Sequence, residues 1–237
     1  MPAVSNKVVE RRRDVRWIAA PLALLLVTFG MLVYAIAIQA RARAILHDVS
    51  ALKVGISSLG EVEALAARHR WDLREKHCDD GKCFVAFEIY NTWLHRLKLE
   101  PVARFRASIA VKGGTVDSIS IMLSRDTRVF PTFPSAGITE EYRKAPEHLG
   151  NSATPYSFPT PVGKPYLWVV LTTQANAVQR EHAYAYSLTC LVKPGGGCDL
   201  PCDYLPLAWH DWQAELETDG FGVGGFGDYY PNRQRCK

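Results

Sequence analysis

The longest apolar segment of the chain is WIAAPLALLLVTFGMLVYAIAIQA, residues 17–40, and it carries no charged side chain. As an α-helix, 24 residues are about 36 Å long, which exceeds the roughly 30 Å hydrocarbon core of a bilayer. Trp17 and Tyr34 stand where membrane proteins place interfacial aromatic residues. The pattern therefore predicts a transmembrane signal anchor over residues 17–40.

Charged residues are unevenly distributed around this segment. Residues 1–16 contain five Lys or Arg and two acidic residues, whereas only Arg41 and Arg43 follow the segment closely. The positive-inside rule then predicts a basic cytoplasmic tail and an extracytoplasmic remainder. The alternative is a signal peptide cleaved after Ala37, because AIA resembles a cleavage site. The apolar run is longer than the usual 7–15 residues of a signal peptide, which favours an uncleaved anchor.

After the anchor, helical periodicity continues and then gives way to strand periodicity. A loose apolar stripe predicts a helical stalk over residues 41–58. Ser58 and Glu61 fit a capping box, which predicts a short amphipathic helix that ends near Arg70. Alternation then predicts strands over residues 83–90, 102–111 and from 116 onward, the last two joined at a Gly-Gly turn.

The second half of the domain has weaker signals. Residues 131–165 contain seven of the fourteen prolines and are interpreted as a long loop, either a surface connection or a partner-binding segment. Residues 165–173 and 184–192 read as strands, with a short helix between them that begins near Thr173. A last helix is expected from about Asp203 to Glu217.

These elements predict an α+β fold. The N-terminal transmembrane helix precedes one extracytoplasmic domain, residues 59–217, with a mainly antiparallel sheet of about five strands and two or three helices. Residues 218–237 form a Gly-rich C-terminal tail.

Charge and composition narrow the class of protein. The formal net charge is +4, of which residues 1–16 contribute +3, so the rest of the chain is almost neutral. A nucleic-acid-binding domain would carry its basic excess on the folded part, and nucleic acid is therefore excluded as a partner. No Asn-x-Ser/Thr sequon occurs, which favours a bacterial cell envelope over a eukaryotic cell surface.

All six cysteines follow the predicted span, where an oxidising compartment favours disulfides. The disulfide candidates are Cys78, Cys83, Cys190, Cys198, Cys202 and Cys236. Six cysteines allow 15 connectivities, so the sequence does not fix the pairing. Local reach favours Cys78 with Cys83 and Cys190 with Cys198, which leaves Cys202 for Cys236.

Two other uses of these cysteines stay open. Structural zinc sites usually have C-x₂-C pairs, and the spacings here match poorly even with His77 as a further ligand. A thiol-disulfide factor typically has a C-x-x-C motif at the start of a helix, whereas CDLPC has three residues between Cys198 and Cys202.

No catalytic, cofactor-binding or metal-binding set can be assembled from the sequence. The adjacent pairs Glu181–His182 and His210–Asp211 do not by themselves converge, and the acidic pairs Asp79–Asp80 and Glu140–Glu141 are interpreted as solvated surface.

The resulting hypothesis is a single-pass protein of the bacterial inner membrane with a periplasmic, disulfide-braced domain. It is expected to be a non-catalytic interaction or assembly module that binds an envelope protein and needs no cofactor. The alternative is an extracytoplasmic enzyme or thiol-disulfide factor that uses the Cys198/Cys202 region.

Overall fold

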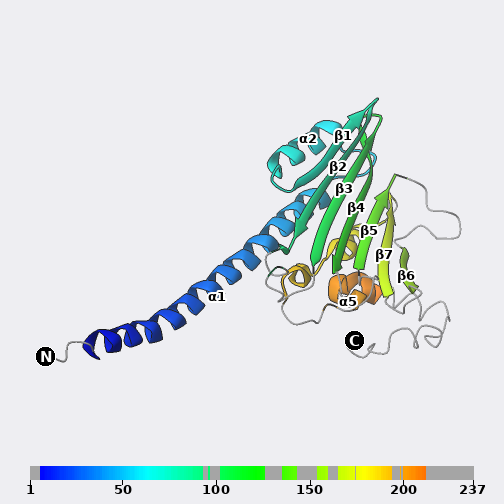
Figure 1. The fold of residues 1–237 in the computed structure, drawn as a ribbon. Helices are drawn as coiled ribbons and strands as arrows, with labels where there is room; N and C mark the ends of the chain where they lie inside the picture. The colour runs from blue at the N-terminus through cyan, green and yellow to red at the C-terminus, as the bar shows by residue number, and fades with distance from the viewer. Residues whose placement is uncertain are drawn as a thin grey trace. The chain divides into compact units, whose positions relative to one another are not determined.

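The computed structural model describes residues 6–92, 96, 102–125, 135–142, 154–159, 165–173, 175–193, 198 and 200–211 (Figure 1). The chain divides into two compact units, Met1–Ala37 and Ile38–Lys237. Helix α1, Asn6–Ser50, begins in the first unit and ends in the second. Each unit is described separately below.

The described part of the first unit is the N-terminal part of α1. Its apolar side chains lie on the surface, and Leu24, Leu25 and Phe29 are each about 64–65% exposed. A helix in the core of a soluble protein would bury such side chains, because exposed apolar area is unfavourable in water. Among the described residues, α1 is the one helix long and apolar enough to cross a membrane.

The second unit is built on a seven-stranded sheet with the order β1-β2-β3-β4-β5-β7-β6. The strands are β1 Leu73–Asp79, β2 Lys82–Tyr90, β3 Ala103–Lys112, β4 Thr115–Arg125, β5 Ser135–Glu141, β6 Thr154–Pro159 and β7 Pro165–Thr172. Neighbouring strands are antiparallel except β5 and β7, which are parallel. The α+β fold with a mainly antiparallel sheet and an N-terminal apolar helix is therefore confirmed.

Two tight hairpins set the register of the first four strands. Asp80 and Gly81 connect β1 to β2, and Gly113 and Gly114 connect β3 to β4; all four residues have positive φ. Two-residue turns with positive φ match the right-handed twist of paired strands, and Gly adopts this backbone without strain. The Gly-Gly hairpin was predicted. Strand β1 was not, because its residues are almost all polar and exposed at the edge of the sheet.

Helices cover one face of this sheet. Helix α2, Leu59–Arg68, contacts β2 and starts at the predicted capping box, with the backbone N–H of Ser58 donating to Glu61 Oε2 at 2.6 Å. The face they cover carries alternate apolar side chains from the central strands. These fully buried residues are Phe87, Phe105, Ile109, Ile119, Ile121, Leu123 and Ile138.

The segment predicted as a stalk, residues 41–58, has a different role. It continues α1 to Ser50, as expected of a helix, but Ala42, Ile45 and Val49 are completely buried. These residues belong to the same compact unit as the sheet. The stalk interpretation was wrong because an apolar stripe at helical spacing indicates packing as readily as a free helix.

The proposed long loop, residues 131–165, contains two strands. Strand β5 lies inside the sheet between β4 and β7, and β6 forms the edge of the sheet beyond β7. Proline content concealed both strands. Pro155 and Pro159 lie in the edge strand, where a missing N–H costs little, and β5 itself contains no proline.

The last described elements form the C-terminal cap, defined here as the described residues within 177–211. It contains α4, Ala177–Tyr184, the 3-10 helix η1, Leu188–Leu191, α5, Pro201–Tyr204, and a helical segment over 206–211. Helix α4 is capped by Asn176 rather than started at Thr173. Residues 212–217 of the predicted last helix, the tail 218–237 and Cys236 lie outside the described residues.

The prediction of a strand over residues 184–192 was wrong. The apolar positions seemed to alternate, but η1 buries Leu188, Cys190 and Leu191 together, which a strand with period two cannot do. This element contacts β3 and β4, and α5 contacts β5 and β7.

Candidate functional site

The first disulfide lies at the β1–β2 hairpin. Cys78 and Cys83 are directly opposite in the register, with their Cα atoms 4.0 Å apart, and they form the predicted pair. Cys78 is exposed, whereas Cys83 is buried. The bond closes a turn that the hydrogen-bonded ladder already holds, so its effect is local.

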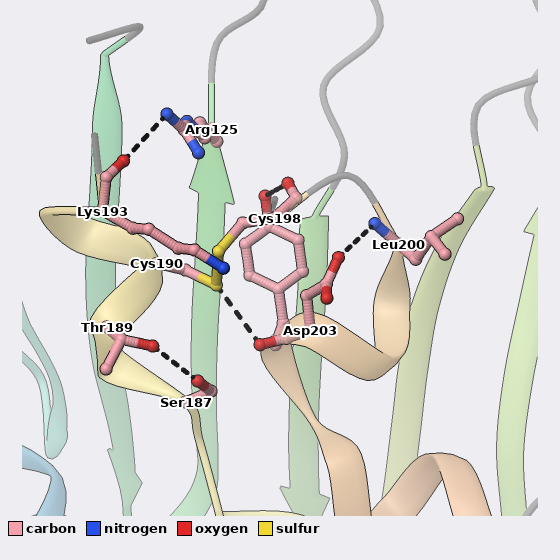
Figure 2. The surroundings of a disulfide bond; sticks show 9 residues. Arg125, Ser187, Thr189, Cys190, Lys193, Cys198, Leu200 and Asp203 are labelled. Carbon is pink, nitrogen blue, oxygen red and sulfur yellow. Dashed lines mark hydrogen bonds between the residues drawn. A yellow bond between two sulfur atoms is a disulfide. The ribbon is translucent and has the colours of Figure 1, made fainter. Parts of the chain in front are cut away.

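The second disulfide joins Cys190 of η1 to Cys198, with the Cα atoms 5.7 Å apart, again as predicted. Figure 2 shows that it lies in the C-terminal cap, in front of the strands of the sheet in this view. Cys190 and Cys198 are only 2% and 1% exposed. A thiol in solution has little access to such a bond.

Several hydrogen bonds fix the chain around this buried disulfide (Figure 2). The Tyr204 hydroxyl donates to the carbonyl oxygen of Cys198 at 2.6 Å, and the backbone N–H of Leu200 donates to Asp203 Oδ2 at 3.0 Å. The backbone N–H of Ser187 donates to the Tyr204 carbonyl at 2.8 Å. The Ser187 bond ties the start of η1 to α5, and the Tyr204 hydroxyl ties α5 to Cys198, the residue that the disulfide joins to η1.

Two contacts connect the disulfide to its surroundings. The Cys190 sulfur lies 3.2 Å from the carbonyl oxygen of Asp203, a close contact rather than a hydrogen bond, because a disulfide sulfur has no hydrogen. The buried Arg125, at the end of β4, donates through Nη2 to the Lys193 carbonyl at 3.3 Å.

Cys202 is disulfide-bonded, and its predicted partner Cys236 lies outside the described residues. The pairing of Cys202 with Cys236 therefore stays a prediction. Cys198 is bonded to Cys190, which gives no support to a redox pair of Cys198 with Cys202. No group of three His, Cys, Asp or Glu side chains within the described ranges could hold a metal ion.

A second feature, a buried ion pair between sheet and cap, has no local signal in the sequence. Glu140 of β5 accepts hydrogen bonds from Arg180 Nη2 at 2.7 Å and from the Tyr184 hydroxyl at 2.8 Å, both on α4. Arg180 Nη2 also donates to the Leu52 carbonyl at 3.2 Å. One carboxylate thus ties the central sheet to α4, and its arginine continues the network to the segment after α1.

The interpretation of Glu140 as solvated surface was wrong, since this residue is only 4% exposed. Its position in β5 explains why. Ala136, Ile138 and Glu140 alternate along the strand and share the covered face of the sheet. Recognising β5 as a strand would have exposed the signal, because an acidic residue in register with two apolar ones needs a partner.

Burial and the neighbouring Glu140 charge together raise the pKa of Tyr184 well above that of an ordinary phenol. Burial lowers the pKa of Arg180, but the Glu140 charge and the Tyr184 hydroxyl outweigh it, and the net pKa is raised. Tyr186, whose hydroxyl donates to the Ile121 carbonyl at 2.8 Å, also has a raised pKa because it is buried. Tyr184 therefore stays a neutral donor and Arg180 a cation at physiological pH.

The fold also brings together two histidine–carboxylate sets. His182 Nδ1 lies 2.8 Å from Asp211 Oδ2, which joins the sequence pairs Glu181–His182 and His210–Asp211. His69 Nε2 lies 2.9 Å from Asp48 Oδ2, and Arg68 binds the same carboxylate. Both link elements far apart in the sequence.

The third polar feature is an arginine-rich cluster where β1 begins, β2 ends and β3 begins. Glu88 pairs with Arg104 at 2.6 Å and with Arg106 at 3.2 Å, and Arg74 lies 3.9 Å from its other oxygen. The Tyr90 hydroxyl donates to Glu88 at 2.8 Å. The Glu88 side chain is 6% exposed, so the carboxylate lies beneath arginines that face solvent.

Comparison with known proteins finds no matching family model, no similar curated protein and no similar solved structure.

Proposed function

We propose that this protein is a membrane-tethered extracytoplasmic domain that acts as an interaction or assembly module in a bacterial cell envelope. The observation that carries the proposal is the joining of two features in one chain. An apolar helix that exposes its side chains continues directly into a domain braced by disulfides.

The orientation follows from charge and redox chemistry. The basic residues 1–16 favour a cytoplasmic N-terminus, which places residues after 40 in the periplasm. Disulfides persist in that compartment and are reduced in the cytoplasm. The two lines of reasoning are independent and favour the same side of the membrane.

A binding role is supported by the way in which the conspicuous polar groups are used. Glu140, Arg180 and Tyr184 satisfy one another between sheet and cap, and the Cys190–Cys198 bond is buried. Groups held in this way stabilise the fold rather than meet a substrate. The domain then acts through the surfaces it presents, with a protein of the envelope as partner.

Reporter fusions after Lys237 test the orientation. A phosphatase that is active only outside the cytoplasm should be active, and a fluorescent protein that matures only in the cytoplasm should be dark. A matched pair of fusions with Arg11, Arg12 and Arg13 replaced by Glu should weaken the phosphatase signal, because the positive-inside bias is removed. A fluorescent fusion of the unmodified chain would refute the proposed topology.

Cross-linking in intact cells, followed by purification of the full chain, tests the binding role. Deleting all of residues 131–165 is not a clean variant, because it removes β5 from inside the sheet. Replacing only residues 143–153 by a Gly-Ser linker leaves β5 and β6 in place. Loss of one cross-linked partner from that variant would assign it to this segment, whereas capture of no specific partner by either chain would contradict the interaction role.

A further inference from the structure

An exposed tryptophan marks one end of the sheet. Trp71, between α2 and β1, is 81% exposed, and the guanidinium of Arg70 lies 5.0 Å from the centre of its ring. A tryptophan ring has an apolar body and a polar N–H, and it is favoured where a less polar phase meets water. The location of Trp71 identifies that phase.

Asp72, the next residue, binds Arg41 of α1 through both guanidinium Nε, at 3.3 Å, and Nη2. Arg41 is the first residue after the apolar run that ends at Ala40. If residues 17–40 lie in a bilayer, Arg41 lies at its surface, since one helical residue advances only about 1.5 Å. Asp72 and Trp71 must then lie close to the same surface.

The charges around Trp71 suit a layer of lipid headgroups. The carboxylates of Asp72 and Glu88 are each 6% exposed, whereas the Arg41 and Arg74 side chains are 49% and 75% exposed. The acidic groups therefore hold Arg41 and Arg74 from beneath, and these two exposed charges are positive. The exposed carboxylate of Glu75, next in the chain, is paired with Arg106 at 3.7 Å. Arginine beside an exposed tryptophan is the residue combination found at membrane–water interfaces, where the cations meet lipid phosphates.

We propose that Arg41, Arg70, Trp71 and Arg74 form a lipid-contacting surface that seats the domain on the outer face of its own membrane. The proposal rests on the anchor described above and adds a second contact with the bilayer. Trp71 enters the headgroup region, and the three arginines bind lipid phosphates around it. The sheet is thereby held in a fixed orientation to the membrane.

Photo-cross-linking of the full chain in lipid nanodiscs tests this surface. Trp71 is replaced by p-benzoylphenylalanine in discs of phosphatidylcholine and phosphatidylglycerol, and lipid adducts are quantified by mass spectrometry. The control is the same replacement at Tyr142, which is 60% exposed. The backbone N–H of Tyr142 donates to the Asp117 carbonyl near the start of β4, at the opposite end of the strands from Trp71.

Position 71 should yield lipid adducts and position 142 should yield almost none. Omitting phosphatidylglycerol should lower the yield at position 71 by at least roughly fivefold, because a single arginine near an anionic surface already contributes about that factor. Arg74→Glu should lower it in the same direction, and Arg74→Lys should restore it. Equal yields at the two positions would overturn the proposal. The same replacement in cell membranes would also overturn it if position 71 formed adducts with protein and none with lipid.

The same samples distinguish a failure of the proposed lipid-contacting surface from a failure of the membrane anchor. Extraction of membranes at alkaline pH releases peripheral proteins and retains proteins that span the bilayer. A chain that is retained but gives no lipid adduct at position 71 keeps its anchor and loses the proposed surface. A chain that is released loses the anchor, and with it the reason for placing Trp71 at the membrane.

Discussion

Two regions of the domain carry a disulfide that closes a short loop, and they use it differently. At the hairpin tip, residues 76–85, the bond joins directly opposed strand residues, and Cys78 is exposed. In the C-terminal cap the bond is buried. Its Cys198 accepts a hydrogen bond from the Tyr204 hydroxyl of α5, and the Tyr204 carbonyl accepts one from Ser187, just before η1. The loops have sequence separations of 5 and 8, so the entropy model assigns both bonds about 2–3 kcal/mol. The difference between them must come from burial.

The largest effect is expected from removing the cap disulfide. Cys190→Ala with Cys198→Ala should lower the free energy of unfolding by about 3–4 kcal/mol, because chain restraint and buried packing are lost together. Urea unfolding of the full chain in detergent, followed by near-ultraviolet circular dichroism, measures the loss. A change no larger than that of the hairpin variant below would erase the distinction between the two regions.

Breaking the buried ion pair should cost nearly as much. Glu140→Ala leaves the Arg180 charge without its carboxylate and should destabilise the domain by about 3 kcal/mol. The matched control is Glu63→Ala near the hairpin, where a half-exposed carboxylate lies 3.3 Å from Lys76 Nζ. That surface pair should contribute less than about 1 kcal/mol. Similar losses from both variants would contradict the assignment of Glu140 as the link between sheet and cap.

Removing the hairpin disulfide should have a smaller and more local effect. Cys78→Ala with Cys83→Ala should cost about 2 kcal/mol or less, because the Asp80–Gly81 turn and the β1–β2 ladder persist without it. Hydrogen exchange should speed up in β1 and at the turn while α5 stays protected. Faster exchange in α5 would show that the two regions are coupled.

The smallest effect concerns alkaline pH and sharpens the account of the cap. The folded-state pKa of Tyr184 is raised above its unfolded value near 10, so its contribution to stability is complete below pH 10 and falls as the pH rises further. Tyr184→Phe should cost about 1 kcal/mol at neutral pH and should weaken the alkaline loss of stability. Parallel stability curves for variant and parent above pH 10 would exclude Tyr184 as a source of that loss.

The sequence predicted best those features that depend on neighbouring residues. The Ser58–Glu61 capping box, the Gly113–Gly114 turn and both short-range disulfides are local, and each appears in the structure. The apolar helix was equally plain, since its signal is continuous over 24 residues. The α+β class followed from the order of these elements.

What the sequence concealed depends on distant partners. Strand β5 has only Ile138 as a large apolar residue, and its pairing with β4 and β7 through the backbone leaves little trace in side-chain pattern. Glu140 and Arg180 are 40 residues apart, so neither position signals the other. The sequence also does not show that Trp71 lies near the end of the apolar run, because that proximity depends on the bond between Asp72 and Arg41, 31 residues apart.

The central claim is that a folded, disulfide-braced domain stands outside the cytoplasm on a membrane anchor. The most direct test is thiol alkylation of the full chain in acid-quenched cells, before and after reduction, with the number of modified cysteines read by mass. The account predicts no modified cysteine before reduction and all six after it. Modification of all six cysteines without reduction would place the domain in a reducing compartment and contradict the account.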